Sequence, residues 1–194
     1  MVVLVRHGRT AWNLERRFLG ATDLPLDEVG RAEAVALGRA AGGRFDAVYA
    51  SPLVRALDTA RALAPPEPAV VDGLRELGHG ALEGLEGTEA IALHPAFFRA
   101  FVDDPTHVRL PGGGETFAEV RDRALSALAG ILASHRPGER VAVVTHQVVI
   151  ATVTSAILGV PLAGWRSQTI PNGAAVALGW DGRWSIAVPR WQAG

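Results

Sequence analysis

The sequence predicts a single α/β domain, a three-layer sandwich with helices on both faces of a mainly parallel central sheet. Short, continuously apolar runs such as Val2–Arg6 and Val141–Thr145 are typical of strands that are buried on both faces. Segments with a helical spacing of apolar residues alternate with these runs, which is the pattern of α/β folds. A length of 194 residues fits one compact domain, so we expect one unit over residues 1–194.

The first half of the chain supplies strands and helices in alternation. After the opening strand, a helix is expected from Asp27, its N-cap, to about Ala41, because apolar residues share one face of this segment. Ala47–Ala50 is the second expected strand. Ser51-Pro52 has the pattern of an N-cap followed by proline at the first helical position, which predicts a helix over Leu53–Leu63.

The middle of the chain is less regular. An apolar run at Ala69–Val71 follows a proline-rich turn. Between Gly73 and Pro111 we expect only short helices, one near Glu86–Leu93 and one near Ala96–Val102.

The last third of the sequence has clear helix, strand and turn patterns. Thr116–Glu119 fits a capping box and opens a helix that reaches about His135. The strand Val141–Thr145 is followed by a helix to about Leu158. A late β-hairpin is expected, in which Ala174–Trp180 and Arg183–Val188 flank the turn Asp181-Gly182.

The composition excludes several kinds of chemistry. The chain has no cysteine, so it has no disulfide, thiolate metal ligand or cysteine nucleophile. All 19 basic residues are arginine, which excludes a lysine Schiff base and the usual P-loop. A net charge of −1 gives no support for a nucleic-acid or membrane-surface partner. The opening apolar run is too short for a signal peptide or membrane span, so we expect a cytoplasmic protein.

Polar residues follow three of the expected strands. Arg6 and His7 end the first strand, Arg55 lies just beyond the second, and His146 follows Val141–Thr145. Ligands of parallel α/β sheets bind beyond the carboxyl ends of the strands, so we expect these side chains to meet in one crevice. Each residue alone has an ordinary structural explanation, but two histidines and two arginines at three strand ends are unlikely to coincide by accident.

These residue types favour phosphoryl transfer through a phosphohistidine. The planar guanidinium of arginine suits bidentate binding of phosphate oxygens. Histidine serves as a nucleophile toward phosphorus or as a hydrogen-bond donor. No metal and no cofactor are expected, because the remaining histidines show no paired ligand spacing: His79, His94, His107 and His135.

Six segments, in order, carry a resemblance to a known family. They are RHG with Asn13, RFLGATDLPLDEVGRAEA, SPLVRALDTA, LRELGHGALEG, PGGGETF and VVTHQ. This set resembles the histidine phosphatase superfamily, and more narrowly its phosphoglycerate-mutase-like branch. The likeness runs from Val2 to about Thr154.

The resemblance implies a role for each matched residue. His7 is the residue that attacks phosphorus, and Arg6, Arg55 and His146 surround the phosphoryl oxygens. Asn13 matches a position that helps to bind phosphate, although it also suits a helix or turn cap.

The proton donor to the leaving group has two candidates. The LRE pattern of the family places it at Glu76, and Glu83 is the competing carboxylate, seven residues further along the chain. A neutral-pH acid needs a raised pKa, which the sequence does not reveal.

Three further positions are candidate substrate contacts. Gly20 and Thr22 match a loop whose backbone amides lie near the substrate in relatives, and the alternative is a plain turn. Gln147 stands where glycine is more usual after the histidine, and it either donates an amide to the substrate or only begins a helix.

The short segment from about residue 77 to 110 bears on the reaction. It resembles a small lid with few basic residues, and such a lid protects a phosphoenzyme from water poorly. We therefore expect a metal-independent hydrolase of a small phosphorylated metabolite, acting as a monomer or homodimer. A cofactor-dependent phosphoglycerate mutase and a non-catalytic phospho-ligand-binding module are the alternatives.

Overall fold

The computed structural model describes residues 1–43, 45–63, 67–180 and 184–187. The helices and strands, in chain order, are β1 (Val2–Arg6), α1 (Ala11–Leu14), α2 (Glu28–Ala41), β2 (Ala47–Ala50), α3 (Val54–Arg61), β3 (Ala69–Val70), α4 (Gly87–Leu93), α5 (Pro95–Asp103), α6 (Phe117–Ala133), β4 (Val141–Thr145), α7 (Gln147–Leu158), β5 (Ala175–Trp180) and β6 (Trp184–Ala187). Short 3₁₀ helices lie at Asp72–Leu74, Gly80–Leu82 and Leu162–Gln168.

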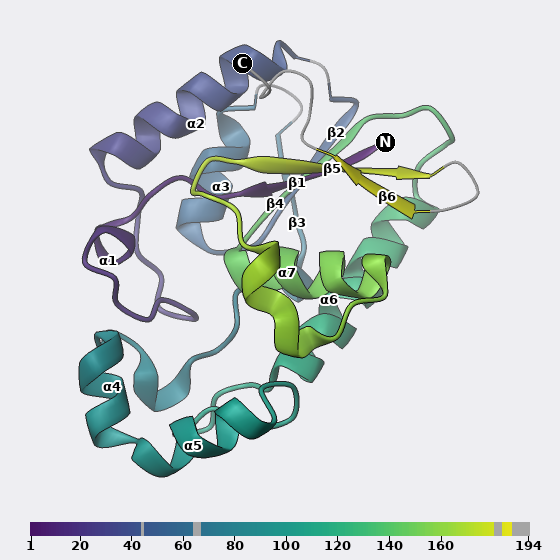
Figure 1. Cartoon of the computed structure of the whole chain (residues 1–194). Helices are drawn as coiled ribbons and strands as arrows, with labels where there is room; N and C mark the ends of the chain where they lie inside the picture. Colours follow the sequence, from purple (N-terminus) through teal and green to yellow (C-terminus); the bar gives the residue numbers. More distant parts are fainter. Residues whose placement is uncertain (44, 64–66, 181–183, 188–194) are drawn as a thin grey trace.

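The described strands form one six-stranded sheet in the order β3-β2-β4-β1-β5-β6. The first four strands in this order are parallel, whereas β5 runs antiparallel to β1 and pairs with β6 as an antiparallel hairpin. Figure 1 shows α2 and α3 on one side of the sheet and α6 and α7 on the other. The predicted fold class is therefore confirmed.

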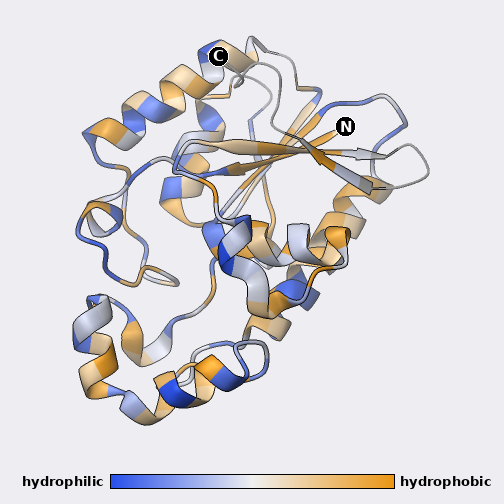
Figure 2. Ribbon diagram, viewed as in Figure 1, coloured by the Kyte–Doolittle hydropathy of each residue, from blue (hydrophilic) through white to orange (hydrophobic). Residues whose placement is uncertain are grey.

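Alternate side chains of the central strands enter two separate cores. Val2 and Leu4 of β1 pack with residues of α6 and α7, whereas Val3 and Val5 pack with residues of α2 and α3. Because both faces are covered, β1 and β4 are apolar throughout rather than alternating. Figure 2 shows these strands as hydrophobic and α2 with mixed hydrophilic and hydrophobic residues.

The parallel register brings three strand ends to one edge of the sheet. Arg6 is paired with Thr145, and Ala50 is paired with Val144. The amide of His7 continues the ladder to the Thr145 carbonyl (3.1 Å). The residues that directly follow these strands are therefore neighbours at this edge: His7, His146 and Ser51.

The prediction that Ser51 caps helix α3 is wrong. The helix begins at Val54 after Leu53, and Ser51 does not cap it. Instead, the Asp23 carboxylate accepts from the Val54 amide at 2.7 Å. A residue 31 positions earlier thus supplies the cap, which local sequence does not reveal.

Other boundaries differ by one to three residues. Helix α3 ends at Arg61 and α6 ends at Ala133, where Ser134 forms the C-cap. The capping box of Thr116 and Glu119 is confirmed. Helix α1 and the 3₁₀ helix Leu162–Gln168 were not expected. The turn Asp181-Gly182 lies outside the described residues.

Helices α4 and α5 follow one another in the segment expected to form a lid, and Figure 1 shows them together beyond the sheet. Phe97 of α5 contacts Phe98 and Phe101 of the same helix, and Phe101 contacts Phe117 of α6 (5.6 Å between ring centroids).

Among the described residues, no single helix is long and apolar enough to cross a membrane. One bent pair, α7 with Leu162–Gln168, meets the length and composition criteria together.

Candidate active site

His7 and His146 lie side by side at the carboxyl edge of the sheet. Their ring centroids are 5.0 Å apart, and both rings are buried. The Nδ1–H of His7 donates to the Gly8 carbonyl at 2.7 Å. The Nε2 of His146 is 2.8 Å from the Ser51 hydroxyl. Burial lowers the pKa of both histidines well below the usual value, and the nearby Arg55 and Arg6 add to this effect.

Arg55 is fully buried in the first turn of α3. Its two terminal nitrogens donate to the carbonyls of Thr22 (2.9 Å) and Gly20 (2.7 Å), while its Nε has no partner among the described residues. The guanidinium is therefore fixed at one end, and its Nε–H group is available for a ligand.

Arg6 is oriented in a similar way at the end of β1. Its Nη1 donates to the Gln147 side-chain oxygen and to the Ile170 carbonyl, both at 2.7 Å. The Nε of Arg6 and the amide Nε2 of Gln147 are buried without a partner in the described part of the chain. Gln147 thus contacts a site arginine besides beginning helix α7.

Glu76 is the buried carboxylate of the site. It accepts from the amides of Leu77 (2.9 Å) and Val148 (3.3 Å), the latter in the first turn of α7. Burial raises the pKa of Glu76, although these hydrogen bonds and the charges of Arg55 and Arg6 act in the opposite direction. Glu76 is therefore suited to hold a proton closer to neutral pH than an exposed glutamate.

Glu83 has a different environment. Its carboxylate accepts from the backbone amides of Gly20 (3.1 Å), Ala21 (2.9 Å), Thr22 (3.3 Å) and His79 (3.1 Å). Burial acts to raise the pKa of Glu83, but these hydrogen bonds outweigh it and lower the pKa.

Two interpretations were open for the amides of Gly20 and Thr22, a substrate contact or a plain turn. In the structure they donate to Glu83, while the carbonyls of the same two residues hold Arg55. The 20–22 loop also leaves no room for a side chain at Gly20, where a Cβ would lie 2.1 Å from the Leu77 carbonyl oxygen. In this structure the two amides are bonded to Glu83 rather than free for a ligand, and the loop orients Arg55.

Asn13 acts as a cap and is linked to the His7 backbone through Asn172. Its Oδ1 accepts from the Thr10 amide (3.1 Å) and from Asn172 Nδ2 (3.2 Å). Asn172 Nδ2 is also 3.1 Å from the His7 carbonyl, to which it donates. Because its oxygen is occupied, Asn13 can offer only its amide N–H groups to an anion.

Four nitrogens stand out together. Arg6 Nε, Arg55 Nε, His146 Nδ1 and Gln147 Nε2 are all buried, and none has a partner among the described residues. Buried N–H groups without an acceptor are costly, and a bound oxyanion would satisfy them. Their number at one strand edge is what an anion site requires, and the site predicted from the sequence stays a prediction.

The family assignment follows from the comparison with known proteins. A model of the histidine phosphatase superfamily (branch 1) matches residues 2–191. The chain belongs to this superfamily. The resemblance found in the sequence is therefore confirmed over nearly the whole chain.

Relatives within the superfamily carry phosphatase and mutase-like names. A metal-independent phosphoserine phosphatase of Arabidopsis thaliana is 40% identical over 169 residues, 84% of this chain and 71% of that protein. A phosphoglycerate mutase-like protein 4 of Arabidopsis thaliana is 39% identical over 158 residues, 78% of this chain and 68% of that protein. A solved mycobacterial glucosyl-3-phosphoglycerate phosphatase, complexed with VO3, superposes with a TM-score of 0.85 at 31% identity, covering 96% of each chain.

Several supporting residues of this histidine phosphatase were not predicted. Ser51 was expected to be a helix cap but contacts His146, and Asn172 was not singled out. Arg123 of α6 donates to the carbonyls of Gly73 (3.0 Å) and Glu76 (3.0 Å), and to the Glu115 carboxylate. Gly73 and Glu76 lie 50 and 47 residues before Arg123 in the sequence, so no local motif marks these contacts.

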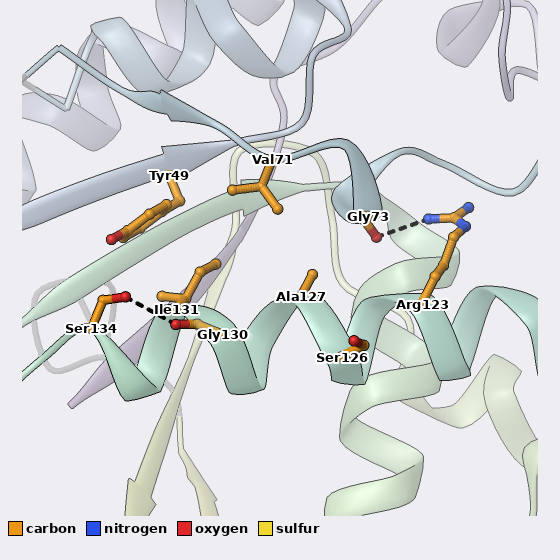
Figure 3. A pocket seen from close by; sticks show the side chains of 9 residues that line it. All are labelled: Tyr49, Val71, Gly73, Arg123, Ser126, Ala127, Gly130, Ile131 and Ser134. Atoms are coloured by element: carbon orange, nitrogen blue, oxygen red, sulfur yellow. Dashed lines mark hydrogen bonds between the residues drawn. The ribbon is translucent and has the colours of Figure 1, made fainter.

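A hollow of about 460 Å³ lies along α6, away from the site residues (Figure 3). Tyr49 and Ile131 line it, and Arg123 reaches from its edge to Gly73. None of the predicted site residues lines this hollow.

In the described part of the chain, no group of three or more histidine or acidic side chains forms a metal site.

Proposed function

We propose that this histidine phosphatase hydrolyses a small phosphomonoester without a metal, through a phosphohistidine formed on His7. The hydrogen bond from His7 Nδ1–H to the Gly8 carbonyl carries the proposal. A carbonyl only accepts, so Nδ1 holds the ring proton and Nε2 carries the lone pair. The lowered pKa keeps the ring neutral, and therefore nucleophilic, at neutral pH.

The unpartnered donors would hold the phosphoryl group during attack. The Nε–H groups of Arg6 and Arg55 face charge that spreads over the oxygens in the transition state. Ser51 Oγ already accepts from the Leu53 amide, which leaves its hydroxyl proton for His146 Nε2. In this arrangement His146 Nδ1 carries a proton and donates to a phosphoryl oxygen.

Glu76 is the proposed acid and base. As His7 Nε2 bonds to phosphorus and the ester P–O bond breaks, Glu76 gives its proton to the leaving oxygen. The resulting carboxylate then takes a proton from the water that attacks phospho-His7. The P–N bond breaks, its electron pair returns to His7 Nε2, and inorganic phosphate leaves. The opposite pKa directions of Glu76 and Glu83 support this choice between the two carboxylates.

The segment of about residues 77–110 is the proposed lid. It includes α4 and α5 and provides Leu77, whose amide bonds Glu76. Its described basic side chains are Arg99 and Arg109, and Arg109 donates to the Gly114 carbonyl and to Glu119. Few cations are thus left for a second acidic group of a substrate, which favours hydrolysis over phosphoglycerate mutase activity.

A cytoplasmic location and a monomer or homodimer belong to the same proposal. The described sheet has β3 and β6 as outer strands, and outer strands are where a second copy can pair. Sedimentation of the purified chain distinguishes the two states.

The test is phosphate release from para-nitrophenyl phosphate in excess EDTA. We expect turnover by the unaltered protein, none by His7→Ala, and unchanged turnover by His107→Ala, an exposed control. Turnover that survives in His7→Ala would refute the nucleophile. No hydrolysis by any variant, together with interconversion of 3- and 2-phosphoglycerate when 2,3-bisphosphoglycerate is added, would favour the mutase. Retained phosphate binding without either reaction would indicate a binding module.

A further inference from the structure

An apolar cavity of about 110 Å³ lies between the proposed lid and the core. Phe97, Phe98 and Phe101 of α5 line it from one side. Phe117 of α6 and Trp165, whose ring centroids are 5.1 Å apart, line it as well. The walls are therefore mostly apolar, and half of the lining residues are phenylalanine or tryptophan. The proposed phosphate site, by contrast, is built from arginines and histidines.

The cavity shares a wall with the proposed proton donor. Leu77 and Val148 give their backbone amides to the Glu76 carboxylate, and the same two residues line the cavity. Glu76 must approach the oxygen that leaves phosphorus, because it protonates that atom. The carbon attached to this oxygen would then lie at the cavity wall, so this space is placed to receive the leaving group.

The polar groups of the cavity favour an uncharged occupant. Burial lowers the pKa of His79 to about 4, so this lining residue is neutral at pH 7. The Nε1 of Trp165 and the Nδ1 of His79 are buried and have no partner among the described residues. The cation that lines the cavity, Arg166, is exposed and lies over the Trp165 ring at 4.9 Å. An ammonium or carboxylate group inside would lose its hydration without a charged partner among the buried lining residues.

We propose that this cavity binds the leaving-group portion of the substrate, and that this portion is an uncharged, apolar alcohol of about four or five carbons. The size follows from the volume of about 110 Å³, since a dry apolar cavity of about 150 Å³ accommodates the six carbons of benzene. This inference rests on the proposed hydrolase function and adds the substrate class to it. Phosphoserine and 3-phosphoglycerate, which carry further charges, are then poor substrates of this chain.

The first test uses alkyl phosphates, because their leaving groups have nearly the same pKa. We expect kcat/KM to rise about fourfold with each added carbon from methyl to pentyl phosphate and then to level off at octyl phosphate. Pentyl phosphate is also expected to exceed phosphoserine and 3-phosphoglycerate by at least about tenfold. Equal rates along the series, or a preference for either charged substrate, would overturn the assignment.

The second test changes the size of the cavity. Phe98→Ala removes one aromatic wall, so we expect the preference to move from pentyl toward octyl phosphate. Val102→Ala is the matched control on the same helix, because Val102 is 80% exposed. An unchanged chain-length profile in a folded Phe98→Ala protein would contradict the proposal.

The third test does not depend on turnover. Phenylphosphonate and methylphosphonate cannot be hydrolysed, and their binding to the unaltered protein is measured by calorimetry. We expect phenylphosphonate to bind at least about tenfold more tightly, and equal affinities would refute the cavity as a subsite. If no ester is hydrolysed but phenylphosphonate binds preferentially, the proposed function fails while the apolar subsite stands.

Discussion

Burial determines what the side chains of the site can do. His7 and His146 are kept neutral, Glu76 is shifted toward its protonated form, and Arg6 and Arg55 retain Nε–H groups for an anion. The residue types predicted that these side chains meet at three strand ends, and the structure brings them together. They did not reveal Ser51 and Asn172, since their contacts with His146 and His7 join positions 95 and 165 residues apart.

The role of Glu76 is tested by changing the leaving group. Glu76→Gln removes the transferable proton and keeps the size of the side chain. We expect kcat for alkyl phosphates to fall roughly 10²- to 10⁴-fold, with a much smaller loss for para-nitrophenyl phosphate, whose leaving group needs no proton. Glu86→Gln, on an exposed side chain, serves as the control. Equal losses for both substrates would assign Glu76 a binding or structural role.

Ser51 is predicted to set the tautomer of His146. Ser51→Ala removes the hydroxyl that faces Nε2, so the ring proton is no longer held on Nδ1. We expect about a tenfold fall in kcat/KM, the equivalent of one neutral hydrogen bond. A ¹⁵N NMR spectrum should show a change of the His146 tautomer in the folded variant. If the His146 signals of Ser51→Ala match those of the unaltered protein, Ser51 does not set the tautomer.

At the scale of elements, one loop connects Glu83 to Arg55. The amides of the 20–22 loop donate to Glu83, and its carbonyls accept from Arg55. The strands and long helices were predicted because their apolar periodicity is local. The role of the 20–22 loop was not predicted, because it depends on partners 33 to 63 residues away in the sequence. Helix α1, with four residues, is too short to show a period.

Glu83 is predicted to act as a positioning residue. Glu83→Ala should release the loop and raise KM more than it lowers kcat, because the proposed contact between Arg55 and the phosphoryl group is made in the ground state as well. Glu83→Gln keeps two acceptor lone pairs and should restore part of the activity. In Arg55→Lys, where the guanidinium is gone, the same Glu83 substitution should cost much less. A full additive loss in the double variant would exclude a shared role.

At the scale of the whole molecule, the two cores and the sheet were predictable from alternation alone. Two features were not predictable in this way, the cap of α3 and the packing of α5 against α6. Both arise only when segments that are distant in the sequence meet. The buried histidines also affect the stability of the whole fold. His7, His79 and His146 all have a lowered pKa in the folded state.

Stability is therefore predicted to fall in acid. The unfolded chain takes up protons at its histidines near pH 6.5, whereas the folded chain resists them, to about pH 4 at His79. Each such histidine lowers the free energy of unfolding by up to about 1.4 kcal/mol per pH unit over this window. Glu76 acts in the opposite direction, because its raised pKa makes the folded state less stable as pH rises above about 4.5.

Urea unfolding at pH 7 and pH 5 measures this effect. The three histidines outnumber Glu76, so the free energy of unfolding should be lower at pH 5. His79→Phe keeps a ring against Phe18 and should reduce the difference between the two pH values, whereas His107→Asn, on an exposed residue, should not. An unfolding free energy that is unchanged or larger at pH 5 would contradict the account.

The central claim is that the phosphoryl group passes through His7. The most direct measurement is rapid-quench trapping with a ³²P-labelled phosphomonoester in excess EDTA, followed by peptide mapping under alkaline conditions, where phosphohistidine survives. We predict acid-labile label on the peptide that contains His7, appearing before free phosphate and absent in His7→Ala. Label on a different residue, or steady hydrolysis by His7→Ala, would contradict the mechanism.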